Sequence, residues 1–410
     1  MKVLLGHKFF YDHGGPETVL FLTRDLLQAA GHQVVDFAMA DPRNRPSPYA
    51  AYFAPNVDLR AVRPTPASAR AALNFLDSRE AARRMRRLVR DTRPDVAHLH
   101  SINHQLTPSV LRVLRDEGVP AVMTLHDYKL VCPAYTMLAR GAVCERCAGG
   151  RFFRASTTRC RGLARSLLLS AESYLQHRLL RSYDGVALFL SPSAFLARKF
   201  REMGFAHPLE VLPNPGPPPA ASTGGERGSH VLFVGRLAPE KGVRTLARAA
   251  VEAGVALKVA GDGPELPALQ REFAGAPAVE FLGRVEPARV GGMMAEALAV
   301  AVPSEWYENQ PMVVLEAFAN ATPVIGADIG GIPELVIEGE TGLLHAPGDA
   351  QELAARLRWA ATHPGELRAM GERAQLVAQR FTPDAYLRDL LDVYARVTAQ
   401  RPAAQPTGVA

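Results

Sequence analysis

Two series of short apolar runs, each run followed by an amphipathic stretch, span almost all of this 410-residue chain. Such an alternation is typical of βα units, in which helices connect the strands of a parallel sheet. Between the two series lies PNPGPPPAASTGGERGS at 213–229, where Pro and Gly dominate and no apolar period survives. The sequence therefore predicts an α/β protein with two Rossmann-like domains joined by a linker.

Each series supplies enough strands for a complete sheet. In the first series, the expected strands are Val3–Gly6, Gln33–Phe37, Val96–His100, Ala121–His126, Gly185–Ser191 and Leu209–Leu212. In the second series, they lie in the runs VLFVGR, LKVAG, VEFLG, ALAVAVPS, TPVIGAD and TGLLHAP. Periodic stretches between the strands, such as Thr18–Ala30 and Ser109–Glu117, predict the connecting helices.

The domain boundaries follow from these runs. We place the first domain at 1–212, the linker at 213–229 and the second domain at 230–382. The amphipathic stretch at 383–400 predicts a final helix, which is long enough to cross back to the first domain. The tail at 401–410 is predicted to be disordered.

The composition is that of a soluble globular protein, with 48% apolar and 21% charged residues. The sequence contains no run of eighteen apolar residues that would predict a membrane span. The opening MKVLLGHKFF has too short an apolar core for a signal peptide. We therefore expect a cytoplasmic protein.

The net charge of +6 is distributed unevenly. Residues 1–228 carry 31 Lys and Arg against 19 Asp and Glu, so this part has a charge of +12 and the remainder −6. A basic first half favours an anionic acceptor or a peripheral contact with the inner face of an anionic membrane, but a merely solvated, Arg-rich surface gives the same pattern. Nucleic acid is not an expected partner, because Arg83–Arg90 has no interleaved aromatic residues.

The most specific stretch of the chain is PSEWYENQPMVVLEAFANATPVIGADIGGIPELV. It places Glu308 and Glu316 eight positions apart across the start of an expected helix, about 12 Å along the axis if all residues between them are helical. Pro311 suits the first helical turn, and Asn309 or Gln310 is expected to cap it. The N-terminus of the helix would hold an anion between the two carboxylates, so a sugar, a diphosphate and a ribose in a row fit this arrangement.

Five further motifs accompany this stretch: GRLAPEKG at 235–242, VAGDGPE at 259–265, HGGPE at 13–17, DVAHLHS at 95–101 and VMTLHDYKLVCP at 122–133. Together with the two expected domains, the motifs resemble the retaining glycosyltransferases of family 4 over nearly the whole chain. The resemblance implies a GT-B fold, in which two Rossmann-like βαβ domains face a central interdomain cleft. It also implies that the C-terminal domain binds a UDP- or GDP-sugar and the N-terminal domain a glycan, lipid-linked or small-molecule acceptor.

The resemblance also assigns the donor site. Arg236 and Lys241 are implied to hold the diphosphate and to offset its charge as the glycosidic bond breaks. Glu316 is implied to bind the ribose hydroxyls and Glu308 the donor sugar, with neither a covalent enzyme intermediate nor a cofactor for the transfer. The implied catalytic set is His126, Arg236, Lys241 and Glu308. The implied donor-binding set is Gly14, Gly15, Gly235, Arg236, Lys241, Gly283, Val285, Glu308, Asn309, Gln310, Pro311, Met312, Val313 and Glu316.

Several residues after the strands of the first domain are expected to complete the site. His126 resembles the family histidine that contacts the donor sugar, and an unperturbed pKa near neutrality suits a bond to a hydroxyl or to the departing oxyanion. Asp127 is expected to orient His126. His100 is expected in the same crevice, either as a contact to sugar or acceptor or as a structural residue, and His98 is expected to be buried.

Glycines follow two of the expected strands. Gly14 and Gly15 are expected to allow a ligand close to the backbone and to permit positive φ. The family pattern often has Ala where this chain has Pro16, which removes one backbone N–H at this position. The loop from Gly283 to Val285 is implied to meet the nucleobase through backbone groups.

All four cysteines lie in one insertion at 132–160: Cys132, Cys144, Cys147 and Cys160. A Cys-x-x-Cys core with two flanking cysteines predicts a structural zinc site with four thiolate ligands. Disulfides, free thiols and a redox pair are the alternatives. Four protein ligands would leave no open position on the metal, so a catalytic zinc is not expected.

Two rival functions share much of this pattern. A GT-B nucleotide-sugar epimerase would alter its sugar without an acceptor, and a non-catalytic subunit would only bind the nucleotide sugar. The intact set of Arg236, Lys241, Glu308 and Glu316 argues against the non-catalytic subunit. A dehydrogenase is disfavoured, because the Gly-x-Gly-x-x-Gly fingerprint is incomplete.

Overall fold

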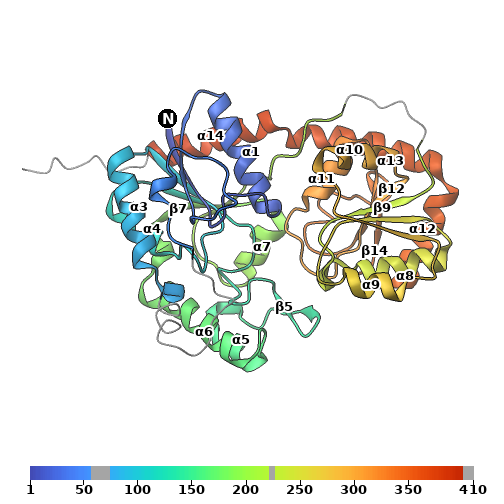
Figure 1. Ribbon diagram of the computed structural model, residues 1–410, viewed down its shortest axis with the longest axis horizontal. Coiled ribbons are helices and arrows are strands. Elements are labelled where there is room, and N and C mark those ends of the chain that lie inside the picture. The colour runs from blue at the N-terminus through green and yellow to red at the C-terminus, as the bar shows by residue number, and fades with distance from the viewer. Residues whose placement is uncertain (57–73, 221–226, 400–410) are drawn as a thin grey trace, which may run out of the picture.

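The computed structural model describes residues 1–56, 74–220 and 227–399. Figure 1 shows two α/β units side by side, one from the blue-to-green half of the chain and one from the yellow-to-red half. Each unit contains a parallel sheet with helices on both of its faces. The predicted class, α/β with two Rossmann-like domains, is therefore confirmed.

In the first domain, the described strands form one sheet in the order β2-β1-β3-β4-β7-β8, and neighbouring strands are parallel. The strands are β1 (Lys2–Gly6), β2 (Gln33–Phe37), β3 (Val96–Leu99), β4 (Ala121–Thr124), β7 (Val186–Ser191) and β8 (Leu209–Val211). The main helices on the sheet are α1 (Gly15–Ala29), α3 (Arg79–Thr92), α4 (Ser109–Asp116) and α7 (Ala194–Glu202). Helices α3, α4 and α7 cover one face of the sheet, and α1 covers the other.

The second domain repeats this plan. Its described strands lie in the order β11-β10-β9-β12-β13-β14, again all parallel. The strands are β9 (Val231–Val234), β10 (Leu257–Ala260), β11 (Val279–Gly283), β12 (Ala299–Val302), β13 (Val324–Ala327) and β14 (Gly342–His345). The helices are α8 (Val243–Ala253), α9 (Leu266–Glu272), α10 (Pro287–Glu296), α11 (Met312–Ala319), α12 (Ala350–Thr362) and α13 (Pro364–Ala378).

The direction of strand addition reverses once in each sheet. The chain runs from β1 outward to β2 and then returns to β3 on the other side of β1. In the second sheet it runs from β9 through β10 to β11, and then returns to β12 beside β9. Such reversals open a crevice at the carboxyl ends of the two central strands, where parallel α/β sheets bind ligands.

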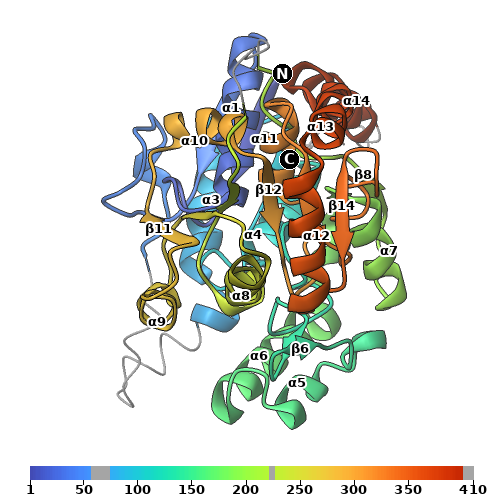
Figure 2. The same ribbon diagram turned by 90° about the vertical axis from the view of Figure 1, so that its right-hand side faces the viewer.

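An insertion separates β4 from β7. It contains the hairpin β5 (Leu138–Ala139) and β6 (Ala142–Val143), followed by α5 (Phe153–Thr158) and α6 (Leu163–Tyr174). In Figure 2 the hairpin and both helices lie together at the lower end of the molecule, far from α14. The insertion therefore extends the first domain away from the end where the final helix lies.

The final helix, α14 (Pro383–Ala399), packs on the sheet of the first domain. Its Tyr394 hydroxyl lies 2.7 Å from Nδ1 of the buried His98, and its Tyr386 hydroxyl lies 2.9 Å from the Thr23 hydroxyl. Near the end of the helix, Arg396 forms an exposed ion pair with Glu210. The chain thus returns to the first domain after completing the second (Figure 1).

The strands expected from the sequence are all present, with small differences at their ends. Strand β3 ends at Leu99 and β4 at Thr124, so His100 and His126 lie just beyond the strands that were expected to include them. The described parts of the expected linker are 213–220 and 227–229, and both lie against the second domain. Gly216 N–H donates to the Phe381 carbonyl and Gly228 N–H to the Glu296 carbonyl, each at 2.7 Å. Residues 221–226, residue 400 and the tail predicted to be disordered lie outside the described residues.

The contact between α14 and β3 gives a stability prediction. Replacing Tyr394→Phe removes the hydroxyl partner of His98 Nδ1, which is fully buried. We expect the free energy of unfolding, measured by urea titration, to fall by about 1–3 kcal/mol, the usual cost of an unsatisfied buried polar group. Tyr386→Phe is the matched control with a smaller expected loss, because Thr23 still donates to the Val19 carbonyl. Equal losses in the two variants would contradict this account.

Candidate active site

The candidate site of the second domain lies at the reversal between β9 and β12. The loop after β9 carries Gly235 and Arg236 and leads into a short 3-10 turn, Pro239–Lys241. The loop after β12 carries Glu308 and leads into α11. The fold therefore brings together two motifs that are about seventy residues apart in the chain.

Glu308 is buried and held by partners from both loops. Its Oε1 accepts a bond from Lys241 Nζ at 2.6 Å and another from the Ser304 hydroxyl at 2.7 Å. Burial pushes the pKa of Glu308 upward, but Lys241 and Ser304 outweigh it, so the pKa lies below its usual value. Glu308 is thus an ionised, fixed acceptor at neutral pH.

Two glycines of the GGIPELV motif allow the Glu308 loop to sit where it does. Gly331 N–H donates to the Glu308 carbonyl at 2.7 Å. A Cβ on Gly331 would lie 1.9 Å from the Asn309 carbonyl oxygen, and one on Gly330, at φ +68°, would lie 2.6 Å from the Glu308 backbone. Only residues without a side chain permit this close approach of two backbone segments.

The two predicted cations differ in their surroundings. Lys241 is partly buried against Glu308, whereas Arg236 is exposed and pairs with Glu240. Both stand at the carboxyl end of β9, so they lie on the ligand-binding edge of the sheet. Lys241 is the more fixed of the two, because its partner is buried.

The structure corrects the expected start of α11. Pro311 is the N-cap in an extended conformation and not part of the first turn, so the segment between the two carboxylates is only partly helical. Gln310 Oε1 accepts from the Asn214 backbone N–H at 2.6 Å, and the Asn309 side chain donates elsewhere, so neither acts as the expected cap in the described structure. The end of α11 that faces this edge of the sheet begins with Met312 and Val313.

Glu316 lies on the second turn of α11 and has no ion-pair partner among the described side chains. Burial alone raises its pKa. A partly buried carboxylate without a charged partner is a suitable acceptor for hydroxyl groups, which matches the ribose contact that was predicted. That contact stays a prediction.

Among the described residues, four hydrogen bonds tie the Glu308 loop to the first domain and the linker. Asn309 Nδ2 donates to the His126 carbonyl at 2.7 Å, and the Tyr128 hydroxyl donates to the Tyr307 carbonyl at 3.1 Å. The Tyr307 hydroxyl in turn donates to Glu145 at 2.8 Å, and the fourth bond is the one from Asn214 to Gln310. The loop therefore spans the boundary between the domains, and sequence reasoning had missed Tyr128, Tyr307 and Glu145.

Three histidines of the first domain form a stacked group. His98 and His100 stack at 4.5 Å between ring centroids, and His100 and His126 at 5.1 Å. Nδ1 of His100 lies 2.8 Å from Nε2 of His126, and His98 is fully buried as expected. Burial, together with the nearby charge of Lys8, lowers the pKa of His126 to about 3. His126 is therefore a neutral hydrogen-bonding group at neutral pH, and its contact with the donor sugar stays a prediction.

Two predictions for the first domain change. Asp127 Oδ1 accepts from the Lys129 backbone N–H at 2.8 Å, so in the described structure it shapes its own turn, and no bond joins it to the His126 ring. Gly14 is extended at φ −177° and Gly15 is the first residue of α1, so the expected positive φ is wrong. Open space surrounds the Cβ position of Gly15, which leaves the backbone there accessible to a ligand.

On the edge strand of the second sheet, Gly283 has φ +65° and its carbonyl accepts from Gly261 N–H at 2.8 Å. Val285 follows it in the loop toward α10. This loop shares an edge of the sheet with Arg236 and Lys241. Its contact with a nucleobase stays a prediction.

No disulfide joins the four cysteines in the structure, in which Cys132 and Cys147 are buried and Cys144 and Cys160 are partly exposed. Burial, followed by the charges of the other three, raises the pKa of the Cys147 thiol to about 12, so the four side chains lie near one another. Yet within the described ranges no group of three or more His, Cys, Asp or Glu is arranged to hold a metal ion. The structural zinc stays a prediction, which metal analysis of the purified protein tests.

Two family models match this chain. The model described as "Glycosyl transferase 4-like domain" matches residues 14–215, and the model described as "Glycosyl transferases group 1" matches residues 228–363. Together the matches cover both domains and contain all of the predicted catalytic residues. The chain belongs to the group 1 glycosyltransferases.

Curated relatives match part of this glycosyltransferase. Glycogen synthase of Mycobacterium tuberculosis is 34% identical over 188 residues, which are 43% of this chain and 44% of the relative. D-inositol 3-phosphate glycosyltransferase of Gordonia bronchialis is 33% identical over 196 residues, which are 43% of this chain and 42% of the relative. Each match spans less than half the length of the relative.

Solved structures match over nearly the full length. Sucrose-phosphate synthase from Thermosynechococcus elongatus has a TM-score of 0.72 at 19% identity, over 97% of this chain and 99% of that chain. Anabaena Alr3699/HepE in complex with UDP-glucose has a TM-score of 0.67 at 19% identity, over 97% and 100%. At this identity the likeness establishes the fold, and it confirms the GT-B architecture.

The raised pKa of Glu316 gives a prediction about stability and pH. A carboxyl whose pKa is higher in the folded than in the unfolded protein reduces stability when ionised, and the loss disappears as pH falls below the unfolded value of about 4.3. We therefore expect Glu316→Gln to be more stable than the native protein at neutral pH, with a difference that vanishes near pH 4. Thermal unfolding across this range measures it, and a difference that does not depend on pH would contradict the assignment.

Proposed function

We propose that this protein is a retaining glycosyltransferase that moves a sugar from a nucleoside-diphosphate sugar to an acceptor bound by its first domain. The observation that carries the proposal is the buried pair of Glu308 and Lys241 at the reversal between β9 and β12, tied through Asn309 to His126. This pair places a cation that can bind the diphosphate next to a carboxylate that can accept hydrogen bonds from the sugar hydroxyls.

Each residue has a separate part in this reaction. Lys241 and Arg236 bind the diphosphate and stabilise the negative charge that grows on it as the glycosidic bond breaks. Glu308 accepts hydrogen bonds from the donor sugar, and Glu316 accepts them from the ribose. Neutral His126 contacts the sugar as a hydrogen-bonding group and takes no part as an acid at neutral pH.

The transfer itself needs no covalent enzyme intermediate. The acceptor hydroxyl forms a bond to the anomeric carbon on the face from which the diphosphate leaves, while the bond between that carbon and the phosphate oxygen breaks. The departing phosphate oxygen takes the proton of the acceptor hydroxyl, so retention follows from attack on the same face. Closure of the two domains excludes water that would otherwise hydrolyse the donor.

The donor is proposed to be a UDP-sugar, since Anabaena Alr3699/HepE, a structure with a similar fold, was solved in complex with UDP-glucose. A GDP-sugar is the alternative. The acceptor is proposed to be a glycan, a lipid-linked molecule or a small molecule. Among the described helices, none combines the length and apolar composition that crossing a bilayer requires. A cytoplasmic location with peripheral contact to an anionic membrane stays a prediction.

Incubation with labelled nucleotide sugars separates the rival functions. For a transferase we expect slow release of unaltered sugar without acceptor and formation of a retained glycoside with one. An altered sugar released without acceptor would identify an epimerase and contradict the proposal. Binding without any turnover would identify a non-catalytic subunit and contradict it equally.

The variant Lys241→Met tests the role of the pair. Loss of a charged hydrogen bond to the diphosphate, worth about 1.5–3 kcal/mol, predicts a fall in UDP affinity of about 10- to 100-fold by calorimetry. Arg248→Met is the matched control, because Arg248 is an exposed cation on α8 that pairs with Glu272. Unchanged UDP affinity and turnover in Lys241→Met would refute the assignment.

A further inference from the structure

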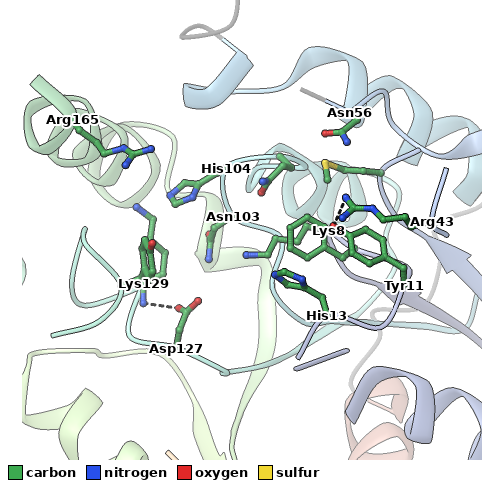
Figure 3. A pocket seen from close by; sticks show the side chains of 14 residues that line it. Lys8, Tyr11, His13, Arg43, Asn56, Asn103, His104, Asp127, Lys129 and Arg165 are labelled. Carbon is green, nitrogen blue, oxygen red and sulfur yellow. Dashed lines mark hydrogen bonds between the residues drawn. The ribbon is translucent and has the colours of Figure 1, made fainter. Parts of the chain in front are cut away.

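A cavity of about 670 Å³ lies in the first domain, at the reversal between β1 and β3. Segments that follow β1, β3 and β4 form much of its wall, and Figure 3 shows their side chains around a common space. The lining residues are Lys8, Phe9, Tyr11, His13, Met39, Arg43, Asn56, Asn103, His104, Gln105, Asp127, Lys129, Tyr135 and Arg165. Asp127 follows His126 directly, so the cavity adjoins the candidate active site.

The charge of this cavity is unbalanced. Four cations line it, and Asp127 is the one acid among its lining residues. Lys129 is neutralised by the buried Glu172 at 2.5 Å, and Arg43 by Asp41 at 2.8 Å. The other two cations, Lys8 and Arg165, form no ion pair with any acid in the part of the chain that the structure describes.

Polar atoms in the wall also lack partners. Asn103 is 5% exposed, and its Oδ1 has no hydrogen bond with the described residues. Nε2 of His104 and Oε1 of Gln105 are also buried atoms without a hydrogen bond to the described residues. Buried polar atoms are normally satisfied, so this group indicates a polar ligand. The two amide oxygens accept hydrogen bonds, so hydroxyl groups of the ligand would satisfy them, whereas the His104 ring can donate.

The positive charges near His104 indicate that this ligand is an anion. Burial, and then the charges of Lys129, Lys8 and Arg165, keep its pKa well below the usual value, so the ring is neutral. The charges of Lys8 and Arg165, and that of Lys129 with its partner Glu172, therefore act on one place in the wall. A neutral imidazole still provides one N–H donor, and the Asn103 amide provides two if it turns toward the ligand.

We propose that the acceptor carries a phosphate group, which binds in this cavity between Lys8 and Arg165 and accepts hydrogen bonds from Asn103 and His104. A phosphate matches these two cations and their neighbouring neutral donors. Asp127, on which the charge of Lys8 acts, can balance only one of the two, so a neutral sugar would leave a net positive charge in the cavity. The name acceptor rests on the proposed function, but the binding of phosphate does not. The phosphate belongs either to a soluble sugar phosphate or to a lipid headgroup.

The test uses the full chain, with and without saturating UDP. Calorimetry with glucose 6-phosphate, inorganic phosphate and glucose forms the soluble arm. Sedimentation with phosphatidylcholine vesicles, with or without phosphatidic acid, forms the lipid arm. In one of the two arms, we expect the phosphate-bearing probe to bind at least about tenfold more tightly than the probe without phosphate. The arm that shows this preference tells whether the phosphate belongs to a soluble sugar phosphate or to a lipid headgroup.

The variants Lys8→Gln and Arg165→Gln should each lower the affinity for the phosphate-bearing probe about tenfold. The affinity for UDP should stay unchanged, which shows that each variant is folded. Arg154→Gln is the matched control, because Arg154 is an exposed arginine of the same insertion that does not line the cavity. The proposal is overturned if neither arm shows a phosphate preference, or if Arg154→Gln weakens binding as much as Lys8→Gln. Absence of UDP binding would instead count against the proposed donor, and the phosphate titration without UDP remains decisive for the cavity.

Discussion

The ion pair between Lys241 and Glu308 is the interaction on which the rest of the site depends. A carboxylate buried in an α/β domain must have a charged or hydrogen-bonding partner, and Lys241 supplies it at 2.6 Å from the neighbouring strand end. Because the two residues follow β9 and β12, their contact closes the crevice at the strand reversal. Gly330 and Gly331 then hold the Glu308 backbone from the other side.

The loop that carries Glu308 is also held by the first domain, and one of its contacts comes from the cysteine insertion. Glu145 lies between Cys144 and Cys147, and it accepts the hydroxyl of Tyr307, the residue before Glu308. Lys199 binds Glu145 at 2.8 Å and fixes it further. The insertion therefore supports the Glu308 loop whether or not its thiols bind a metal, and loss of its structure would disturb the position of Glu308.

Much of the fold was predictable because both faces of each sheet are covered. Strands such as Val231–Val234 then become continuous apolar runs, which a sequence displays directly. Lys241 and Glu308 were predictable because they lie in compact motifs at strand ends. The low pKa of His126 was not predictable, because it follows from burial and from the charge of Lys8, which is far away in the sequence. Lys8, Asn103 and Arg165 were missed, because they are far apart in the sequence and belong to no motif.

The amino-acid sequence by itself determined two α/β domains, their order of strands and helices, and the residues that stand at the carboxyl ends of the central strands. These features can be predicted from short stretches of sequence. A strand buried on both faces is a continuous apolar run, and a turn depends on the types of a few neighbouring residues. Only the tertiary structure decided which side chains meet across the domain boundary, as Asn309 meets His126. It also decided that Lys8 and Arg165 line one cavity without an ion pair to any acid in the described chain, with Asp127 as the single acid among the lining residues. Charge compensation depends on distances through space, and these follow from packing.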